Sequence, residues 1–251
     1  MTQPPNQASL VRLFQAQYRD FTDDIEMYLE LAAMHGGPIL ELGCGSGRVL
    51  LELARAGFST VGLDHDLNML LRIGNQTEMG QSVELVQAKL EDLPFSAKFG
   101  MIISPCSTFG HLNESQLLQS LAHARRLMAA NGRLVVDLPA PTQSPLDEED
   151  DDLLEWFHEP ERGTDVQVSA DQRMISASLF EIDWHYDELL PDGHVERHSF
   201  TRRYHLRDVA EMERILAMVG FAIEDAFGDY QRAHFTAASS GFILIAKPQT
   251  T

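Results

Sequence analysis

The residues best suited to chemistry form the segment PILELGCGSGR at positions 38–48, where an apolar run with one acid breaks into three glycines at alternate positions. Such a run is typical of a buried strand, and residues 49–56 that follow carry apolar side chains at helical spacing. The glycines therefore lie in a strand-to-helix turn, where a backbone without side chains can approach a ligand closely. The pattern predicts a nucleotide-binding loop.

A second short apolar segment, residues 59–63, ends in Asp64 about twenty residues downstream of the glycines. A carboxylate at the end of a second strand is placed to accept hydrogen bonds from two vicinal ribose hydroxyls. A dinucleotide fingerprint would require a third glycine where this chain has Arg48. The pattern therefore favours a ligand that contains adenosine but no pyrophosphate. It disfavours a nicotinamide-dependent oxidoreductase as the function.

The segment ELGCGSG at residues 41–47, together with Asp64, resembles the first two motifs of class I S-adenosylmethionine-dependent methyltransferases. Further segments match in the family's order: 91–95 the turn after the third strand, 99–104 the fourth strand, and 131–137 the glycine turn and fifth strand. The resemblance spans roughly residues 18–138 and returns in the C-terminal part. It implies S-adenosyl-L-methionine as the cofactor and methyl transfer as the activity.

The resemblance also implies roles for individual residues. The glycines shape the loop under the methionine moiety, Glu41 orients that loop and the cofactor's amino group, and Asp64 holds the ribose. The complete implied set of cofactor-binding residues is Glu41, Gly43, Cys44, Gly45, Gly47, Arg48, Asp64, His65, Leu90 and Ser104.

Three of these assignments have alternatives. His65 matches a position that packs on adenine, but it also fits an exposed turn histidine. Arg48 could grip the cofactor carboxylate in a bidentate fork, or stand exposed at a helix start. Cys44 and Cys106 are thiols lining the pocket, or simply small residues in tight turns; their placement suggests neither a disulfide nor a metal site.

Lys89 departs from the family pattern, in which an aspartate commonly accepts a hydrogen bond from the adenine amino group. Lysine cannot accept one. Glu91 or Asp92 could take over, or the backbone beside Leu90 could recognise adenine. This departure motivates an alternative function: a catalytically inactive regulatory protein that binds S-adenosylmethionine or S-adenosylhomocysteine.

The elements that position these residues alternate between strand and helix over residues 39–104, which predicts an α/β fold with a doubly wound, mostly parallel sheet. The resemblance implies that this sheet has seven strands. A helix over residues 14–34 precedes the sheet, and another begins at the cap candidate Asn113. We expect residues 1–138 and 206–251 to form the S-adenosylmethionine-binding domain.

Residues 139–205 are too many for a connection in such a domain, and they predict an inserted β-rich lid or substrate subdomain. The acidic run at 147–152 predicts an exposed, solvated segment, with binding of a cation as the alternative. Residues 174–186 and 194–204 flank a Pro-Asp-Gly turn and predict a hairpin.

Methyl transfer to a neutral amine needs positioning more than a base, whereas a hydroxyl acceptor usually needs a base for its proton. The acceptor is expected at the carboxyl edge of the sheet, and the acceptor atom, nitrogen or oxygen, stays open. Each candidate for the acceptor side fits a packing or loop role as well. These candidate catalytic residues are Tyr18, His111, Tyr186 and Tyr204.

Composition limits the class of partner. The 251 residues contain 38 Asp and Glu against 19 Lys and Arg, and the net charge of −19 disfavours a nucleic-acid substrate. The sequence contains no run of eighteen apolar residues and no secretory signal pattern, so we expect a cytoplasmic protein that binds no membrane. A small-molecule methyl acceptor, no metal, and a monomer or homodimer complete the expectation.

Overall fold

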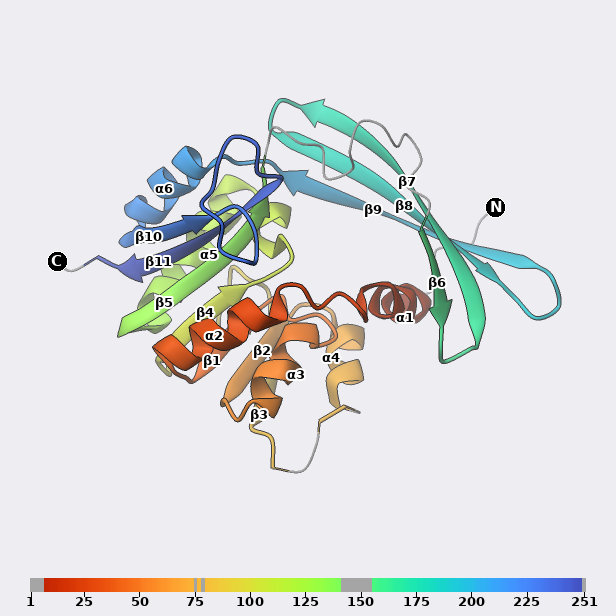
Figure 1. The fold of residues 1–251 in the computed structure, drawn as a ribbon, viewed down its shortest axis with the longest axis horizontal. Helices are drawn as coiled ribbons and strands as arrows, with labels where there is room; N and C mark the ends of the chain where they lie inside the picture. The colour runs from red at the N-terminus through yellow and green to blue at the C-terminus, as the bar shows by residue number, and fades with distance from the viewer. Residues whose placement is uncertain (1–6, 75, 78–79, 141–154, 250–251) are drawn as a thin grey trace. The chain divides into compact units, whose positions relative to one another are not determined.

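The structure, a computed structural model, describes residues 7–74, 76–77, 80–140 and 155–249 (Figure 1). The chain divides into two compact units. The larger unit comprises Thr22–Thr142 and Leu206–Thr251, and the smaller unit comprises Met1–Phe21 and Gln143–His205. The expected acidic segment at 147–152 lies outside the described residues.

The larger unit is built on a seven-stranded sheet with the strand order β10-β11-β5-β4-β1-β2-β3. Neighbouring strands from β3 to β5 pair in parallel, and β11 runs antiparallel to both β5 and β10. The doubly wound, mostly parallel sheet predicted from the sequence is confirmed. Its strands are β1 (Ile39–Leu42), β2 (Thr60–Asp64), β3 (Val83–Gln87), β4 (Phe99–Ser104), β5 (Met128–Pro139), β10 (Phe221–Phe227) and β11 (Gly241–Pro248).

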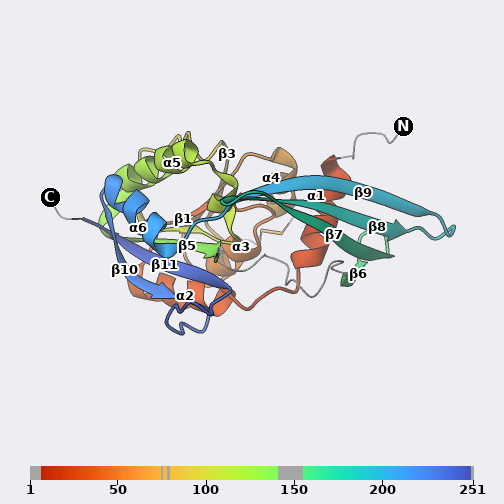
Figure 2. The same ribbon diagram turned by 90° about the horizontal axis from the view of Figure 1, so that it is seen from above.

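Helices cover both faces of this sheet, because its central strands are apolar on both sides. Leu40 and Leu42 of β1 pack into the cluster formed with α5 (Glu114–Leu127) and α6 (Val209–Met218). Ile39 points to the other face, where the cluster includes α2 (Ile25–His35) and α3 (Arg48–Arg55). Figure 2 shows α5 and α6 on one side of the sheet and α2 on the other. The remaining helices are α4 (Leu67–Gly74) and the 3₁₀ helix η1 (Thr108–His111).

Helix α5 begins where the sequence predicted. The side chain of Asn113 accepts a hydrogen bond from the backbone N–H of Gln116, and the Gln116 side chain accepts one from the backbone N–H of Asn113. This reciprocal capping box satisfies two backbone donors that an uncapped helix would leave without partners.

The smaller unit is a four-stranded antiparallel sheet with the order β6-β7-β8-β9, together with helix α1 (Gln7–Tyr18). The predicted hairpin around the Pro-Asp-Gly turn at 191–193 is confirmed as β8 and β9. Its first strand begins at Leu179 and not at residue 174, because Ala177 and Ser178 turn the chain between β7 and β8. That turn contains none of the Gly, Asn or Pro residues that usually mark a hairpin. The strands are β6 (Glu155–Glu159), β7 (Thr164–Ser176), β8 (Leu179–Leu189) and β9 (Val195–His205).

The single N-terminal helix predicted over residues 14–34 is two helices, α1 and α2, separated by residues 19–24. The apolar spacing continues across the break, so periodicity alone could not reveal it. Asp24 precedes the first residue of α2 as its N-cap. Residues 7–21 group with the β-rich unit, since α1 packs against β6. The sequence-based division had placed them with the larger unit.

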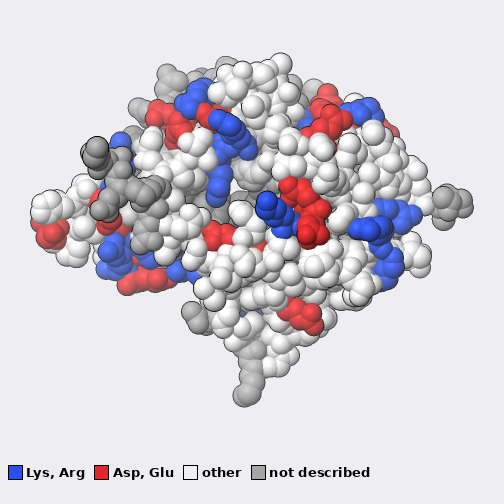
Figure 3. Space-filling model, turned by 180° about the vertical axis from the view of Figure 1, so that it is seen from behind, with Lys and Arg blue, Asp and Glu red and all other residues white. Residues whose placement is uncertain are grey.

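Charged side chains in the structure are largely paired. On the face shown in Figure 3, basic and acidic side chains lie beside one another in several places. In the larger unit Arg133 of β5 pairs with Glu224 of β10, across the intervening β11. In the smaller unit Arg197 and Asp187 pair between the adjacent strands β9 and β8. Among the described residues, no helix is both long enough and apolar enough to cross a membrane.

A buried ion cluster ties α1 to the sheet of the smaller unit. Arg12 is only 8% exposed and donates hydrogen bonds to Glu159 and, at 2.7 Å, to Glu188. Thr164 donates to the other oxygen of Glu188, Oε1, at 2.7 Å. Arg162 Nη1 donates at 3.0 Å to Oε2, the same oxygen that Arg12 contacts. Burial acts to raise the pKa of Glu188, but the hydrogen bonds from Arg12 and Thr164 outweigh it and hold the pKa below its usual value.

The substitution Arg12→Met removes the shared positive partner of two buried carboxylates. We expect it to lower the free energy of unfolding by about 3–5 kcal/mol, because an unpaired buried charge is costly. Arg19→Met is the matched control, since Arg19 pairs with Asp20 on the surface, and it should cost less than about 1 kcal/mol. Urea unfolding followed by circular dichroism measures both; equal losses for the two variants would contradict the prediction.

Candidate functional site

The glycine loop predicted from the sequence connects β1 to α3. Gly43, Gly45 and Gly47 all have positive φ angles, of 73°, 53° and 87°. The backbone N–H groups of Gly43 and Cys44 both donate to the carbonyl of Leu63 in β2, at 2.8 and 3.0 Å. Glycine adopts this left-handed conformation at little cost, so the residue type and the backbone geometry agree.

Space around the loop differs between its glycines. A side chain at Gly43 would overlap the Thr108 side chain, and one at Gly47 would come within 2.9 Å of Ile73 Cγ1. A side chain at Gly45 would meet no protein atom within 4 Å. The two outer glycines therefore allow close packing, while the middle one faces open space where a ligand can approach.

Asp64 lies at the end of β2 and joins the second strand to the glycine loop. Its Oδ2 accepts from the N–H of Gly45 at 2.9 Å, and its Oδ1 accepts from the N–H of Asp66 at 2.8 Å. Burial would raise its pKa, but the hydrogen bonds from His65, Asp66 and Gly45 outweigh it and lower the pKa below the usual value. The carboxylate is thus ionised at neutral pH, and Oδ2, which accepts only from Gly45, keeps a lone pair for a further donor.

Glu41 and Ser104 carry polar atoms that are buried without a partner. Glu41 lies on β1 and is 3% exposed, and its Oε2 makes no hydrogen bond. Burial, with the charges of Asp24 and Asp64 adding and that of Arg48 opposing, raises the pKa of Glu41 to about 8. Ser104, at the carboxyl end of β4, is fully buried, and its Oγ also has no hydrogen-bond partner. Such orphaned atoms are rare in proteins and point to a missing partner.

Arg48 follows the last glycine of the loop and forms a bidentate pair with Asp24. Its Nη1 and Nη2 donate to the two Asp24 oxygens at 2.5 and 2.6 Å, and the Asp24 side chain is fully buried. The sequence analysis missed Asp24, which was read as part of a continuous helix. Neither sequence alternative for Arg48 describes this pair, because its guanidinium fork already holds a protein carboxylate.

Asp137 is a second buried acid that the sequence analysis did not single out. It lies at the carboxyl end of β5, and its carboxylate accepts from the N–H of Cys106 at 3.0 Å and of Ser107 at 2.6 Å. The Tyr230 hydroxyl donates to Asp137 Oδ2 at 2.9 Å. An acid ending an apolar strand, as Asp64 does, was the available signal.

Residues expected on the adenine side lie after β2 and β3. His65 is exposed, with its ring 3.4 Å from Asp64, and Leu90 is half-buried. Lys89 is exposed, and its carbonyl accepts from the N–H of Asp92 at 3.0 Å. The Glu91 carboxylate accepts from the side chain of Gln116 at 2.5 Å. One of the acceptors proposed to replace the family's aspartate is therefore engaged with α5.

The acceptor-side candidates fall in different units. His111 is an exposed residue at the end of η1 in the larger unit, whereas the three tyrosines belong to the smaller unit. Tyr186 is buried, stacks with Phe200 and donates its hydroxyl to Gln17 at 2.6 Å. Burial first, then the neighbouring Tyr18, raises the pKa of Tyr186 well above its usual value. Its hydroxyl therefore stays protonated, which excludes Tyr186 as a base at neutral pH. Tyr204 is half-buried on β9.

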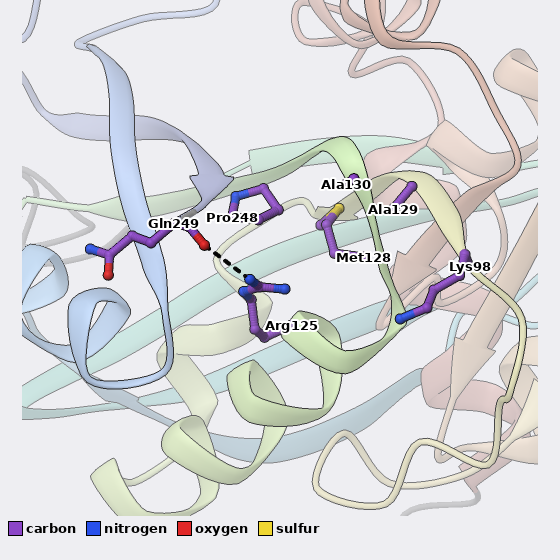
Figure 4. Close-up of a pocket in the computed structure, with 7 residues that line it drawn as sticks. All are labelled: Lys98, Arg125, Met128, Ala129, Ala130, Pro248 and Gln249. Atoms are coloured by element: carbon purple, nitrogen blue, oxygen red, sulfur yellow. Dashed lines mark hydrogen bonds between the residues drawn. The ribbon is translucent and has the colours of Figure 1, made fainter. Parts of the chain in front are cut away.

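Two other features of the described residues could be taken for ligand-binding sites. Glu188, Glu196 and His198 bring ligand atoms within 4.8 Å of one another, but Arg12 and Arg162 already neutralise Glu188. A surface pocket of about 570 Å³ is lined by Lys98, Arg125, Met128 and neighbouring residues (Figure 4). It lies at the amino ends of β4 and β5, opposite the edge where ligands bind in such sheets.

Comparison with known proteins agrees with this geometry. A family model described as a methyltransferase domain matches residues 39–132. A putative methyltransferase of Geobacillus sp. (strain WCH70), GWCH70_2453, is 23% identical over 214 residues, covering 83% of either chain.

Solved structures show the same fold. The sugar N-methyltransferase KedS8 from Streptoalloteichus sp. ATCC 53650 has a TM-score of 0.75 and 16% identity, covering 98% of this chain and 95% of its own. CalS10 from Micromonospora echinaspora, an amino pentose methyltransferase solved with S-adenosylmethionine, has a TM-score of 0.75 and 14% identity, covering 99% and 100%. The match to a methyltransferase domain, the methyltransferase relatives and the seven-stranded sheet together support a class I S-adenosylmethionine-dependent methyltransferase.

Proposed function

We propose that this methyltransferase transfers the methyl group of S-adenosylmethionine to a nitrogen of a small molecule, with oxygen as the alternative acceptor atom. The observation that carries the cofactor site is the ionised Asp64, which is held by Gly45 and Asp66 and retains acceptor capacity at the end of β2. It is the group that a ribose with two vicinal hydroxyls requires.

The residues present fit the cofactor. Glu41 and Ser104 offer buried oxygens without partners, and the backbone at Gly45 faces open space. In this proposal Asp64 holds the ribose, Glu41 receives the cofactor's ammonium group, and the glycine loop lies against the methionine moiety. His65, Leu90 and Ser104 complete the proposed set.

The cofactor supplies an electrophilic methyl group on a sulfonium, and the protein supplies position and exclusion of water. An amine that arrives neutral attacks directly, so positioning alone, worth roughly 7–11 kcal/mol in favourable cases, suffices for catalysis. The protonated Tyr186 cannot take a proton at neutral pH. A hydroxyl acceptor, unlike a neutral amine, would need another group as the base for its proton.

Two of the structural neighbours support the acceptor class, since one is a sugar N-methyltransferase and the other an amino pentose methyltransferase. The net charge of −19 agrees with a small-molecule acceptor, because it opposes binding of a nucleic-acid backbone. Tyr18, Tyr204 and His111 stay candidates for contacts with the acceptor.

A second function, cofactor binding without turnover, rests on Lys89. Its exposed ammonium stands where related enzymes commonly have an aspartate, and Glu91 is occupied by Gln116. Such a protein would bind S-adenosylmethionine and S-adenosylhomocysteine but would methylate nothing.

Calorimetric titration with S-adenosylmethionine, S-adenosylhomocysteine and NADH tests the cofactor assignment. We expect micromolar binding of the first two and none of NADH. Formation of S-adenosylhomocysteine is then measured with paired small molecules that carry an amine or a hydroxyl at the same position. Turnover with amines supports the proposal, turnover with hydroxyls alone replaces nitrogen by oxygen, and binding without any turnover favours the regulatory alternative.

Removing the carboxylate of Asp64 should weaken S-adenosylmethionine binding by about 1–3 kcal/mol, through loss of charge-assisted hydrogen bonds to the ribose. Asp64→Asn and Asp64→Ala are titrated calorimetrically beside Asp225→Asn. Asp225 is an exposed aspartate on β10, at the other edge of the sheet from β2 and β3. Unchanged affinity in folded Asp64 variants would remove Asp64 from the site.

Binding should release a proton from Glu41. Its pKa of about 8 means that the carboxyl is protonated in the free protein at neutral pH, and a cationic ligand favours the ionised form. Affinity should therefore rise with pH between about 6 and 8, by up to about tenfold per unit. Titration at pH 7 in buffers of different ionisation enthalpy counts the proton, and Glu41→Gln should abolish this release. Equal proton counts in both proteins would refute the assignment.

Restoring an acceptor at position 89 tests how adenine is recognised. If the adenine amino group has no side-chain partner, Lys89→Asp should tighten S-adenosylmethionine binding by about 1 kcal/mol. Lys89→Ala is the control, because it removes the charge without adding an acceptor. Equal tightening by both would assign the effect to charge, and no change in either would place position 89 away from the adenine.

A further inference from the structure

The turn after β4 has an unusual backbone. Cys106 and Ser107 are consecutive non-glycine residues with positive φ angles, of 53° and 57°. This left-handed conformation is costly for residues with a Cβ, and it persists where surrounding contacts impose it. The turn lies at the carboxyl edge of the sheet, directly after Ser104.

Asp137 is the group that imposes this conformation. One carboxylate accepts both consecutive N–H groups, Cys106 to Oδ2 and Ser107 to Oδ1. Asp137 is 4% exposed, so these hydrogen bonds form away from water, where an unpaired carboxylate would be expensive. The Tyr230 hydroxyl supplies its third hydrogen bond, and the Tyr230 ring packs against the apolar cluster that contains α2.

The same turn contacts the glycine loop at both ends. At the first glycine, the Thr108 side chain occupies the space that a Gly43 side chain would need. At the other end, Arg48 Nη2 donates to Cys106 Sγ at 3.0 Å while its guanidinium holds Asp24. None of the three hydrogen bonds to Asp137 comes from the glycine loop. The turn that Asp137 holds, however, contacts Gly43 and Arg48.

We propose that Asp137 and Tyr230 are positioning residues for the cofactor loop. They hold the turn after β4 in its left-handed form, and Thr108 and Cys106 transmit this position to Gly43 and Arg48. The inference rests on the proposed function, in which the glycine loop binds S-adenosylmethionine. Loss of the Asp137 carboxylate releases the turn and weakens cofactor binding without removing any group that touches the cofactor.

The test is calorimetric titration of the full-length protein with S-adenosylmethionine, comparing the dissociation constant with the stoichiometry. Asp137→Asn keeps the size of the side chain but replaces one acceptor by an amide donor that faces an N–H group. We expect its dissociation constant to rise at least tenfold at unchanged stoichiometry. A purely structural role would lower the folded, binding-competent fraction and leave the dissociation constant of that fraction unchanged.

Tyr230→Phe keeps the experiment decisive if Asp137→Asn does not fold. It removes one hydrogen bond to Asp137, and we expect a twofold to fivefold rise in the dissociation constant. Asp225→Asn is the matched control for Asp137→Asn, because Asp225 is exposed on β10 and the same substitution there should change nothing. Wild-type affinity in the folded Asp137 and Tyr230 variants would overturn this inference and leave the proposed function standing. Failure of the wild-type protein to bind would instead overturn the proposed function.

Discussion

The attachment of the glycine loop to the end of β2 is the interaction on which the rest of the site depends. The Leu63 carbonyl accepts two loop N–H groups, and the neighbouring Asp64 carboxylate accepts a third. Because β1 and β2 are adjacent parallel strands, their carboxyl ends lie at one edge and these hydrogen bonds are short. The open space at Gly45 and the acceptor capacity of Asp64 both follow from this attachment.

Two acids of this edge have opposite protonation behaviour for a physical reason. Asp64 receives several hydrogen bonds that outweigh its burial, so its pKa falls. Glu41 is buried with one oxygen unpartnered and with two acids nearby, so its pKa rises to about 8. Groups whose environments separate their pKa values in this way are typical of functional sites. In the proposed function, the ligand would bring hydroxyl donors to Asp64 and positive charge to Glu41.

Much of the larger unit could be predicted from the sequence, because its signals are local. Apolar strands, alternate glycines and the Asn113 cap each act within a few residues, and all three were predicted correctly. The prediction was wrong at some element boundaries. The helix predicted over 14–34 is two helices, and α1 packs against β6, which is far away in the sequence. The start of β8 was missed for a local reason, because the β7–β8 turn at Ala177 and Ser178 has no Gly, Asn or Pro.

The sequence by itself determined the family, the cofactor class and the residues that follow each strand, since these depend on residue type and spacing. Only the tertiary structure decided which hydrogen-bond partners those residues have. Arg48 is committed to Asp24, Tyr186 to Gln17, and Asp137 to the strained turn after β4. Each of these contacts joins segments that the fold brings together and that no local pattern relates. Burial and hydrogen bonding, which set the charge of Glu41 and Asp64, exist only once the chain has folded.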